Sequence, residues 1–383
     1  MSLKRLALAL LLTLTLALPL AACAPAAPKP ADVVARYYAA LNAQELDQAM
    51  GYVAPDAVFV NPYGRFAGTE AVRASLQLVM NDGITFDLSN FRDTNGRVTY
   101  DYTVKVGGEA VESGTDGLTV VQYGKITLDA TEALEWLAYV NTAAFTAETG
   151  GFSGPASVPA GWTELSLTNA SDGIHHLQLV KLVDGKTAAD LLAALQADGE
   201  NWPSWAVPAG GPNAPDPGAT TTAVVNLEEG NYAVLSVIPN GEGVPGFLNG
   251  MLTTLTVTAA QATTQAPPAD LTIDLTEFAL GIGGSVPAGP HVLAIRNQGT
   301  QVHEAYLVKL NDGATVDDYL NTPPDAAPPA VGIGGITGIA PGAVNYAGVW
   351  LEAGHYALFC FFPDPASHAP HFALGMVAEF TVP

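Results

Sequence analysis

The chain has 383 residues, of which 49% are apolar and 13% are charged, and its formal net charge is −23. With 37 acidic residues against 14 basic ones, the chain does not offer the clustered Lys and Arg that phosphate binding requires, so a nucleic-acid partner is excluded. Apolar residues are spread along the whole chain, which excludes a mainly disordered protein. The length predicts two or three domains, each with its own core.

The first residues carry the pattern of an export signal. The basic pair Lys4–Arg5 precedes an apolar run over residues 6–20, and small residues then lead directly to Cys23. This order resembles the lipobox of bacterial lipoproteins, and the resemblance implies cleavage before Cys23 and lipidation of its thiol. Residues 1–22 are then a signal peptide, and residues 23–30 tether an extracytoplasmic lipoprotein to a cell-envelope membrane. The alternative is an ordinary signal peptide with a chance cysteine.

Residues 31–130 are predicted to form an α+β domain. Helical spacing gives way to alternating strand patterns, with expected helices at 32–41, 45–52 and behind Thr69, and expected strands at 57–61, 84–91, 98–106 and 118–128. This order, with the phrases VVARYYAALNAQELDQAM, APDAVFVNPYGRFAG and GTEAVR, resembles the SnoaL-like branch of the nuclear transport factor 2-like superfamily. The resemblance implies a cone-shaped domain, in which a curved sheet surrounds a pocket.

Members of that superfamily include cyclases, isomerases and dehydratases, which use a His or a carboxylate as a base in the pocket, and plain binding modules. Residues 1–150 contain no His, and Asp56 lies in a predicted turn, where a turn-forming role is expected. Tyr38, Phe59 and Asn61 are candidate pocket residues for a small apolar ligand, although core packing predicts the same pattern. We therefore favour a binding or structural domain over a cyclase or isomerase, and expect no catalytic residue in the chain.

The rest of the chain is an internal repeat. Its two copies span residues 142–258 and 270–383, and residues 259–269 form a linker rich in Thr, Gln and Pro. Matching segments are 157–161 (SVPAG) with 285–289, 175–182 (HHLQLVKL) with 303–310 (HEAYLVKL), and 227–233 (LEEGNYA) with 351–357 (LEAGHYA). Short alternating strands separated by Gly and Pro predict an all-β Greek-key sandwich in each copy.

The second copy contains His303 near its start and Cys360, His371 and Met376 near its end. If Cys23 carries lipid, Cys360 is the one cysteine left and has no disulfide partner in the chain. The Val-Pro-Ala-Gly turn, the strand ending in Asn before the His, and the final Cys, His and Met resemble the cupredoxins. The resemblance implies one copper ion held by two imidazoles, a thiolate and a weak axial thioether, which suits both oxidation states of copper. Electron transfer to a redox protein, or copper binding, is the expected role.

The first copy is an internal control for this interpretation. It keeps His175 where the second copy has its first ligand, but Ser236 replaces Cys360 and Gly246 replaces His371. Because the thiolate and one imidazole are missing together, the first copy is predicted to be metal-free.

Several alternatives stay open. The loop from Cys360 to His371 is longer than is usual in cupredoxins, and it contains His368 as a rival ligand. Zinc would also accept two imidazoles and a thiolate, although a thioether adds little to a zinc site. In a further alternative the protein is a metal-free binding or scaffolding lipoprotein. His291 and His355 are expected to lie at the surface.

Overall fold

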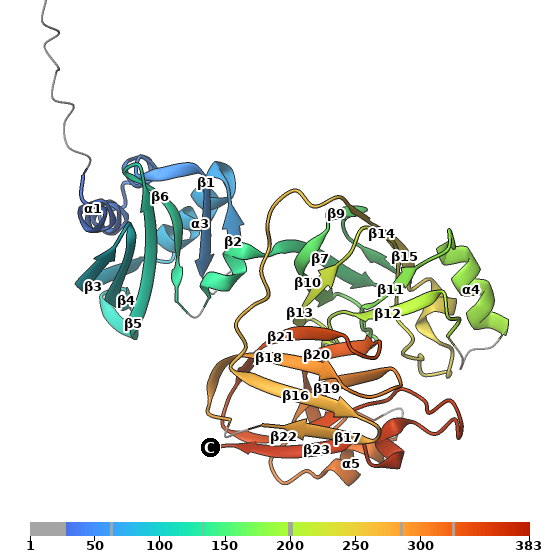
Figure 1. The fold of residues 1–383 in the computed structure, drawn as a ribbon. Helices are drawn as coiled ribbons and strands as arrows, with labels where there is room; N and C mark the ends of the chain where they lie inside the picture. Colours follow the sequence, from blue (N-terminus) through green and yellow to red (C-terminus); the bar gives the residue numbers. More distant parts are fainter. Residues whose placement is uncertain (1–27, 62–63, 133, 198–201, 284–285, 324–325) are drawn as a thin grey trace, which may run out of the picture. The chain divides into compact units, whose positions relative to one another are not determined.

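The structure, a computed structural model, describes residues 28–61, 64–132, 134–197, 202–283, 286–323 and 326–383 (Figure 1). The predicted signal peptide and Cys23 lie outside the described residues. Within these described ranges, no helix is both long and apolar enough to cross a membrane. The chain divides into two compact units between Glu132 and Ala133, here called unit 1 and unit 2.

Unit 1 is a six-stranded sheet with helices packed on it (Figure 1). Its elements are α1 (Pro30–Asn42), α2 (Leu46–Met50), β1 (Val53–Asn61), β2 (Gly64–Ala67), α3 (Thr69–Asn81), β3 (Ile84–Thr94), β4 (Arg97–Val106), β5 (Glu109–Gln122) and β6 (Lys125–Thr131). The strand order is β2-β1-β6-β5-β4-β3, and β1 and β6 run parallel whereas the other neighbours are antiparallel. The expected helices correspond to α1, α2 and α3.

Helix α1 covers the sheet with one apolar face. Val34, Tyr37 and Leu41 recur at intervals of three or four residues and are buried, because that spacing brings side chains onto one side of a helix. Pro30 stands in the first turn, where the missing N–H removes no helical hydrogen bond. The same core includes Phe59 of β1.

Unit 2 contains two copies of one strand arrangement, preceded by a short turn of helix, η1 (Glu135–Tyr139). The first copy consists of β7 (Asn141–Glu148), β8 (Gly151–Ser153), β9 (Ser157–Pro159), β10 (Gly161–Asn169), β11 (Gln178–Leu182), α4 (Ala188–Ala197), β12 (Ala206–Gly210), β13 (Thr220–Leu227), β14 (Gly230–Leu235), η2 (Gly246–Asn249) and β15 (Leu252–Thr258). The second consists of β16 (Leu271–Thr276), β17 (Ala279–Ile282), β18 (Gly289–Asn297), β19 (His303–Leu310), α5 (Val316–Leu320), β20 (Ala330–Ile339), β21 (Val344–Leu351), β22 (Gly354–Phe359), η3 (His371–Leu374) and β23 (Val377–Val382).

The two copies share their strand register. Leu179 of β11 lies opposite Val234 of β14, and Leu307 of β19 lies opposite Leu358 of β22. Continuing each strand pair by the same steps places Ser236 where Cys360 stands. The hydrogen bonds agree, because Phe247 N donates to Ser236 O and Phe372 N donates to Cys360 O, both at 2.8 Å.

Both sheets of unit 2 run through the two copies. One has the order β17-β16-β18-β21-β13-β10-β7-β8, and the other β23-β22-β19-β20-β12-β11-β14-β15-β9. The copies meet at the pairs Val224–Tyr346 and Ala209–Ile339. The segment expected as a linker also packs on the first copy, where Thr264 Oγ1 accepts a hydrogen bond of 2.8 Å from Trp162 N. The two copies therefore form one continuous unit and are not separate domains joined by a linker alone.

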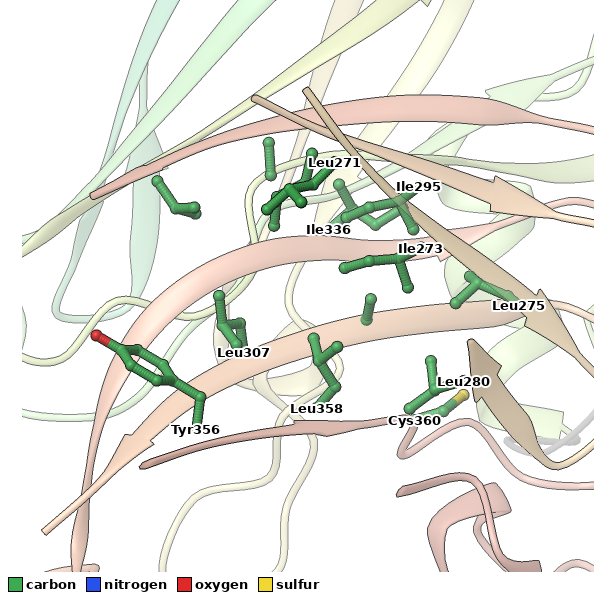
Figure 2. Packing of buried hydrophobic residues seen from close by; sticks show 14 of the residues in the cluster. Leu271, Ile273, Leu275, Leu280, Ile295, Leu307, Ile336, Tyr356, Leu358 and Cys360 are labelled. Carbon is green, nitrogen blue, oxygen red and sulfur yellow. The ribbon is translucent and has the colours of Figure 1, made fainter. Parts of the chain in front are cut away.

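The core of the second copy lies between its two sheets. Figure 2 shows apolar side chains from facing strands, among them Ile273, Leu307 and Leu358. Cys360 and Met376 belong to the same cluster of buried side chains, and both have no exposed surface. Two of the residues predicted to bind a metal are thus set into a packed core, where side chains have little freedom to move.

Candidate metal centre

His303, Cys360 and His371 come together in the second copy. All three are fully buried, and their donor atoms lie within 4.8 Å of one another. His371 Nδ1 lies 3.1 Å from His303 Nδ1 and 3.4 Å from Cys360 Sγ. In the described part of the chain, no other three His, Cys, Asp or Glu side chains converge in this way. Two imidazole nitrogens and one sulfur therefore face a common point.

Strand pairing and one turn of helix bring the three residues together. His303 opens β19, and Cys360 directly follows β22, the antiparallel neighbour of β19. His371 opens η3, and its backbone N–H donates to Phe362 O at 2.8 Å. The next amide, Phe372 N, donates to Cys360 O. These bonds fold the long loop back on its own start, so its length does not carry His371 away from Cys360.

Met376 is connected to both of these ligand candidates through its backbone. Its N–H donates to His371 O at 3.0 Å, and its carbonyl accepts from Cys360 N at 3.3 Å. Its side chain is fully buried in the core cluster of the second copy.

The other histidines lie elsewhere. His368, the rival ligand, is exposed on the loop and does not belong to the convergent group. The expectation that His291 lies at the surface is wrong, because its side chain is 5% exposed. Its Nδ1 contacts the Asp270 carboxylate and its Nε2 contacts Pro287 O at 2.8 Å, and these partners make burial of the ring tolerable. His355 is 42% exposed.

Neighbouring side chains orient the imidazole of His371. Its Nε2 lies 2.9 Å from Gln301 Oε1, and an amide oxygen only accepts, so this nitrogen carries the proton. Nδ1 is then left with a free lone pair toward Cys360 and His303. Gln301 is held in turn by Asp364, whose Oδ1 accepts from Gln301 Nε2 at 3.0 Å. Such outer contacts fix the tautomer of a metal-binding histidine.

The buried environment favours the neutral form of every donor. Desolvation lowers the pKa of His303 to about 4, and the neighbouring His371 adds to this effect. Burial also lowers the pKa of His371 below its usual value. The pKa of the Cys360 thiol is raised well above its usual value, mainly by burial and then by the nearby Glu304. A thiol in this position ionises only with a cation beside it, so metal binding would release a proton.

Glu304 is a buried carboxylate at this centre that the sequence analysis missed. Its side-chain Oε1 accepts from Phe361 N at 2.8 Å, and its backbone N–H donates to Cys360 Sγ at 3.4 Å. Burial raises the pKa of Glu304 to about 7. The available signal was a charged residue inside the apolar strand that begins at His303.

The first copy has the same backbone without the same donors. Ser236 Oγ and His175 Nδ1 are buried and have no hydrogen-bond partner among the described residues. A Cβ atom on Gly246 would lie 2.9 Å from Ser236 O, so the backbone there leaves no room for a side chain. No group of three convergent His, Cys, Asp or Glu side chains forms in this copy, as far as the structure describes it.

In unit 1, the predicted pocket residues Phe59 and Asn61 are not among the residues that line the pocket beside Tyr38. Phe59 is buried in the core, with its ring 6.0 Å from that of Tyr37, and Asn61 Nδ2 donates to Ser75 Oγ at 3.0 Å. Tyr38 does line a pocket of about 320 Å³ between α1 and β3. The other lining residues are Ala35, Ala39, Asn42, Phe86, Asp87, Leu88 and Phe91.

Behind Tyr38 lies Asp129 of β6, which the sequence analysis also missed. Thr119 Oγ1 donates to its carboxylate at 2.8 Å and Tyr38 OH at 3.1 Å, and Tyr100 OH lies 3.0 Å from Tyr38 OH. Desolvation raises the pKa of Asp129 to about 6, against the lowering effect of these hydrogen bonds. The signal that could have found it is a lone acid within the alternating strand KITLDAT.

A family profile described as "SnoaL-like domain" matches residues 34–128. Residues 34–128 form a SnoaL-like domain. The match confirms the predicted family for this part of the chain. Tyr38 lies in the matched range, and Asp129 directly follows it. No curated protein matches the chain.

Solved structures similar to the chain cover about the length of this SnoaL-like domain. An NTF2-like protein from Cytophaga hutchinsonii is 19% identical and covers 27% of this chain and 87% of its own, with a TM-score of 0.24. A cystatin-fold protein from Novosphingobium aromaticivorans is 19% identical and covers 27% of this chain and 97% of its own, with a TM-score of 0.24. An LEH-like epoxide hydrolase from M. tuberculosis is 19% identical and covers 26% of this chain and 75% of its own, with a TM-score of 0.23.

Proposed function

We propose that the second copy of unit 2 is a cupredoxin-like domain that holds one copper ion with His303, Cys360, His371 and Met376. The observation that carries the proposal is the convergence of two Nδ1 atoms and one Sγ in a fully buried position. The outer nitrogen of His371 and the sulfur of Cys360 are held by Gln301 and by the Glu304 N–H, so these contacts fix both donors in place.

The donor set favours copper over zinc. A thiolate with two imidazoles would suit either ion. The fourth candidate, Met376, distinguishes them: it offers a buried thioether shortly after η3, the turn that begins with His371. A thioether adds little to zinc and suits copper, particularly in its reduced state. Copper would supply a reversible one-electron carrier at this position.

The residues of the chain prepare the centre in three ways. Burial keeps water away from the donors, and the low pKa of His303 keeps its imidazole neutral at physiological pH. Gln301 holds the His371 tautomer in which Nδ1 is free. Backbone hydrogen bonds fix Met376 against Cys360 and His371, so the donors change position little when the oxidation state changes.

We further propose that this electron carrier works outside the cytoplasm. The lipobox-like sequence ending at Cys23 supports export and anchoring to a cell-envelope membrane by a lipid. A centre of this type would exchange electrons with a redox protein partner.

Copper loading of the full chain in a Cys23→Ser background tests the proposal. We expect one copper per chain and an intense visible absorption from thiolate-to-copper charge transfer, both lost in Cys360→Ser. The matched control is Ser236→Ala, which alters the corresponding position of the first copy and should leave the absorption unchanged. Absence of the band in the parent protein, or its persistence in Cys360→Ser, would contradict copper ligation by Cys360.

Asp129 supports a second candidate function, in which the SnoaL-like domain binds a small apolar ligand or acts as an isomerase or cyclase. Its carboxyl, with a pKa of about 6, lies behind an aromatic-lined pocket and can exchange a proton near neutral pH. The probe is 2-naphthol, an apolar ring with one hydroxyl. Binding followed by fluorescence should weaken in Asp129→Ala and not in Asp47→Asn on the exposed side of α2, and equal affinities would exclude this pocket.

A further inference from the structure

We propose that the first copy of unit 2 supports the metal centre of the second copy, and that Asn213 and Glu304 are the positioning residues that connect them. This proposal rests on the proposed function, because the restrained loop carries the ligand candidate Cys360. The restraint itself consists of hydrogen bonds within the chain and does not depend on a bound ion.

Glu304 holds the loop at the ligand itself. Its Oε1 accepts from Phe361 N at 2.8 Å, one residue after Cys360, and its own N–H donates to Cys360 Sγ at 3.4 Å. Glu304 is 4% exposed, so its carboxylate depends on protein donors. Hydrogen bonds to a buried carboxylate are among the stronger ones in proteins, which makes this residue an effective restraint.

The donor for the second carboxylate oxygen comes from the first copy. Asn213 lies between β12 and β13, is 3% exposed, and directs Nδ2 to Glu304 Oε2 at 3.3 Å. The same Nδ2 donates to Ile336 O at 2.9 Å, and the Asn213 backbone N–H donates to Gly335 O at 3.3 Å. Asn213 is thus fixed on β20 while it faces Glu304.

A bulge in β20 lies opposite Glu304 and is bound by the first copy. His303 pairs with Ile339 and Ala305 pairs with Ile336, so two residues of β20 face one residue of β19. Those two residues bond to the first copy. Thr337 N donates to Gly211 O at 2.9 Å, and Gly338 O accepts from Gln178 Nε2 at 2.9 Å.

The first copy has a different side chain at the position of Glu304. At the position of Glu304 it has His176, whose Nε2 accepts from Val237 N at 3.1 Å. That contact holds the corresponding loop with a neutral acceptor, where Ser236 stands in place of the thiol. A carboxylate bonded by a residue of the other copy is thus found in the second copy, which carries the ligand candidates.

Thiol labelling of the metal-free full chain tests the restraint without copper. In a Cys23→Ser background, a disulfide reagent reaches the buried Cys360 only when the loop opens, so the labelling rate measures opening. We expect Asn213→Ala and Glu304→Ala each to raise the rate by about tenfold or more. The double variant should exceed the faster single variant little, because both changes break one chain of contacts. Glu304→Gln keeps an acceptor for Phe361 N and serves where the alanine variant fails to fold.

His176→Ala is the matched control, since it removes the corresponding contact in the first copy and should leave labelling of Cys360 unchanged. After copper loading, Asn213→Ala should shift the thiolate-to-copper band, which general destabilisation would not do. Labelling of Asn213→Ala at the parent rate, additive effects in the double variant, or equal acceleration by His176→Ala would overturn the inference. An absent copper band in the parent protein would overturn the proposed function, while the labelling data would still decide this one.

Discussion

His303 Nδ1 and His371 Nδ1 lie 3.1 Å apart, although one residue opens β19 and the other opens η3. Two imidazoles at this distance share one proton or one cation, because two protonated nitrogens would repel each other in a buried place. Burial lowers the pKa of His303, and repulsion from His371 lowers it further. The position is therefore prepared for a single positive charge between the two rings.

This relationship distinguishes His371 from the neighbouring His368. Replacing His371 by Ala removes a donor and should weaken copper binding by about a hundredfold or more, because even losing an outer contact costs about 10–100-fold. His368→Ala changes an exposed ring outside the convergent group, and its copper affinity should stay within about twofold of the parent value. Competition with a chromophoric copper chelator measures both. A large loss in His368→Ala alone would reverse the ligand assignment.

Gln301 is expected to act through His371. In Gln301→Leu the Nε2 proton loses its acceptor, both tautomers become populated, and copper affinity should fall about tenfold. Gln298→Leu is the matched control, since this residue contacts Asp274 on the exposed side of the same turn. The same chelator competition reads out both variants, and equal affinities for Gln301→Leu and the parent would show that the contact does not select the tautomer.

Asp129 should make stability depend on pH. Its pKa is raised to about 6 in the folded protein from 3.8, so between these values the folded state keeps a proton that the unfolded state has lost. Stability should therefore fall as pH rises from about 4 to about 6, by up to about 3 kcal/mol, and then level off.

The comparison variant for this dependence is Asp129→Asn, whose amide oxygen can still accept from Tyr38 and Thr119. Urea unfolding of both proteins, followed by a probe of unit 1, gives the difference in unfolding free energy at each pH. A difference that stays constant between pH 4 and pH 6 would show that Asp129 does not titrate in this window.

Gly246 marks the point where the first copy has no room for a ligand side chain. In Gly246→Ala the new Cβ would lie 2.9 Å from Ser236 O, which is backbone and cannot turn away. We expect the free energy of unfolding to fall by about 1–3 kcal/mol. Gly241→Ala, at a nearby position where a Cβ meets no atom within 4 Å, should change it by less than about 0.5 kcal/mol. Similar denaturation curves for the two variants would disprove the crowding.

The sequence predicted the features that depend on local pattern or on repetition. The alternation and order of elements in residues 31–130 led to the SnoaL-like domain, and the family profile confirms it. The cluster of His303, Cys360 and His371 was found because the first copy lacks the counterparts of Cys360 and His371. Their proximity in the structure agrees with that hypothesis, and copper stays a prediction.

What the sequence could not predict depends on contacts between distant segments. Asp129 acquires its raised pKa from burial behind Tyr38 and Tyr100, which are far away along the chain. Glu304 becomes notable only beside Asn213 of the other copy. Phe59 lies in a strand whose burial does not alternate, since Val60 beside it is buried too, and its core partners come from α1 and α3 as well as from the sheet.

The junction between the two copies also determines how the protein can be divided. Strands β12 and β13 of the first copy meet β20 and β21 of the second, so neither copy leaves these strands unpaired. Cutting the chain between the copies would expose backbone N–H and C=O groups beside apolar residues such as Val224, which is 1% exposed. Exposed edges of this kind recruit further strands and lead to aggregation. Each copy therefore protects the other against self-association.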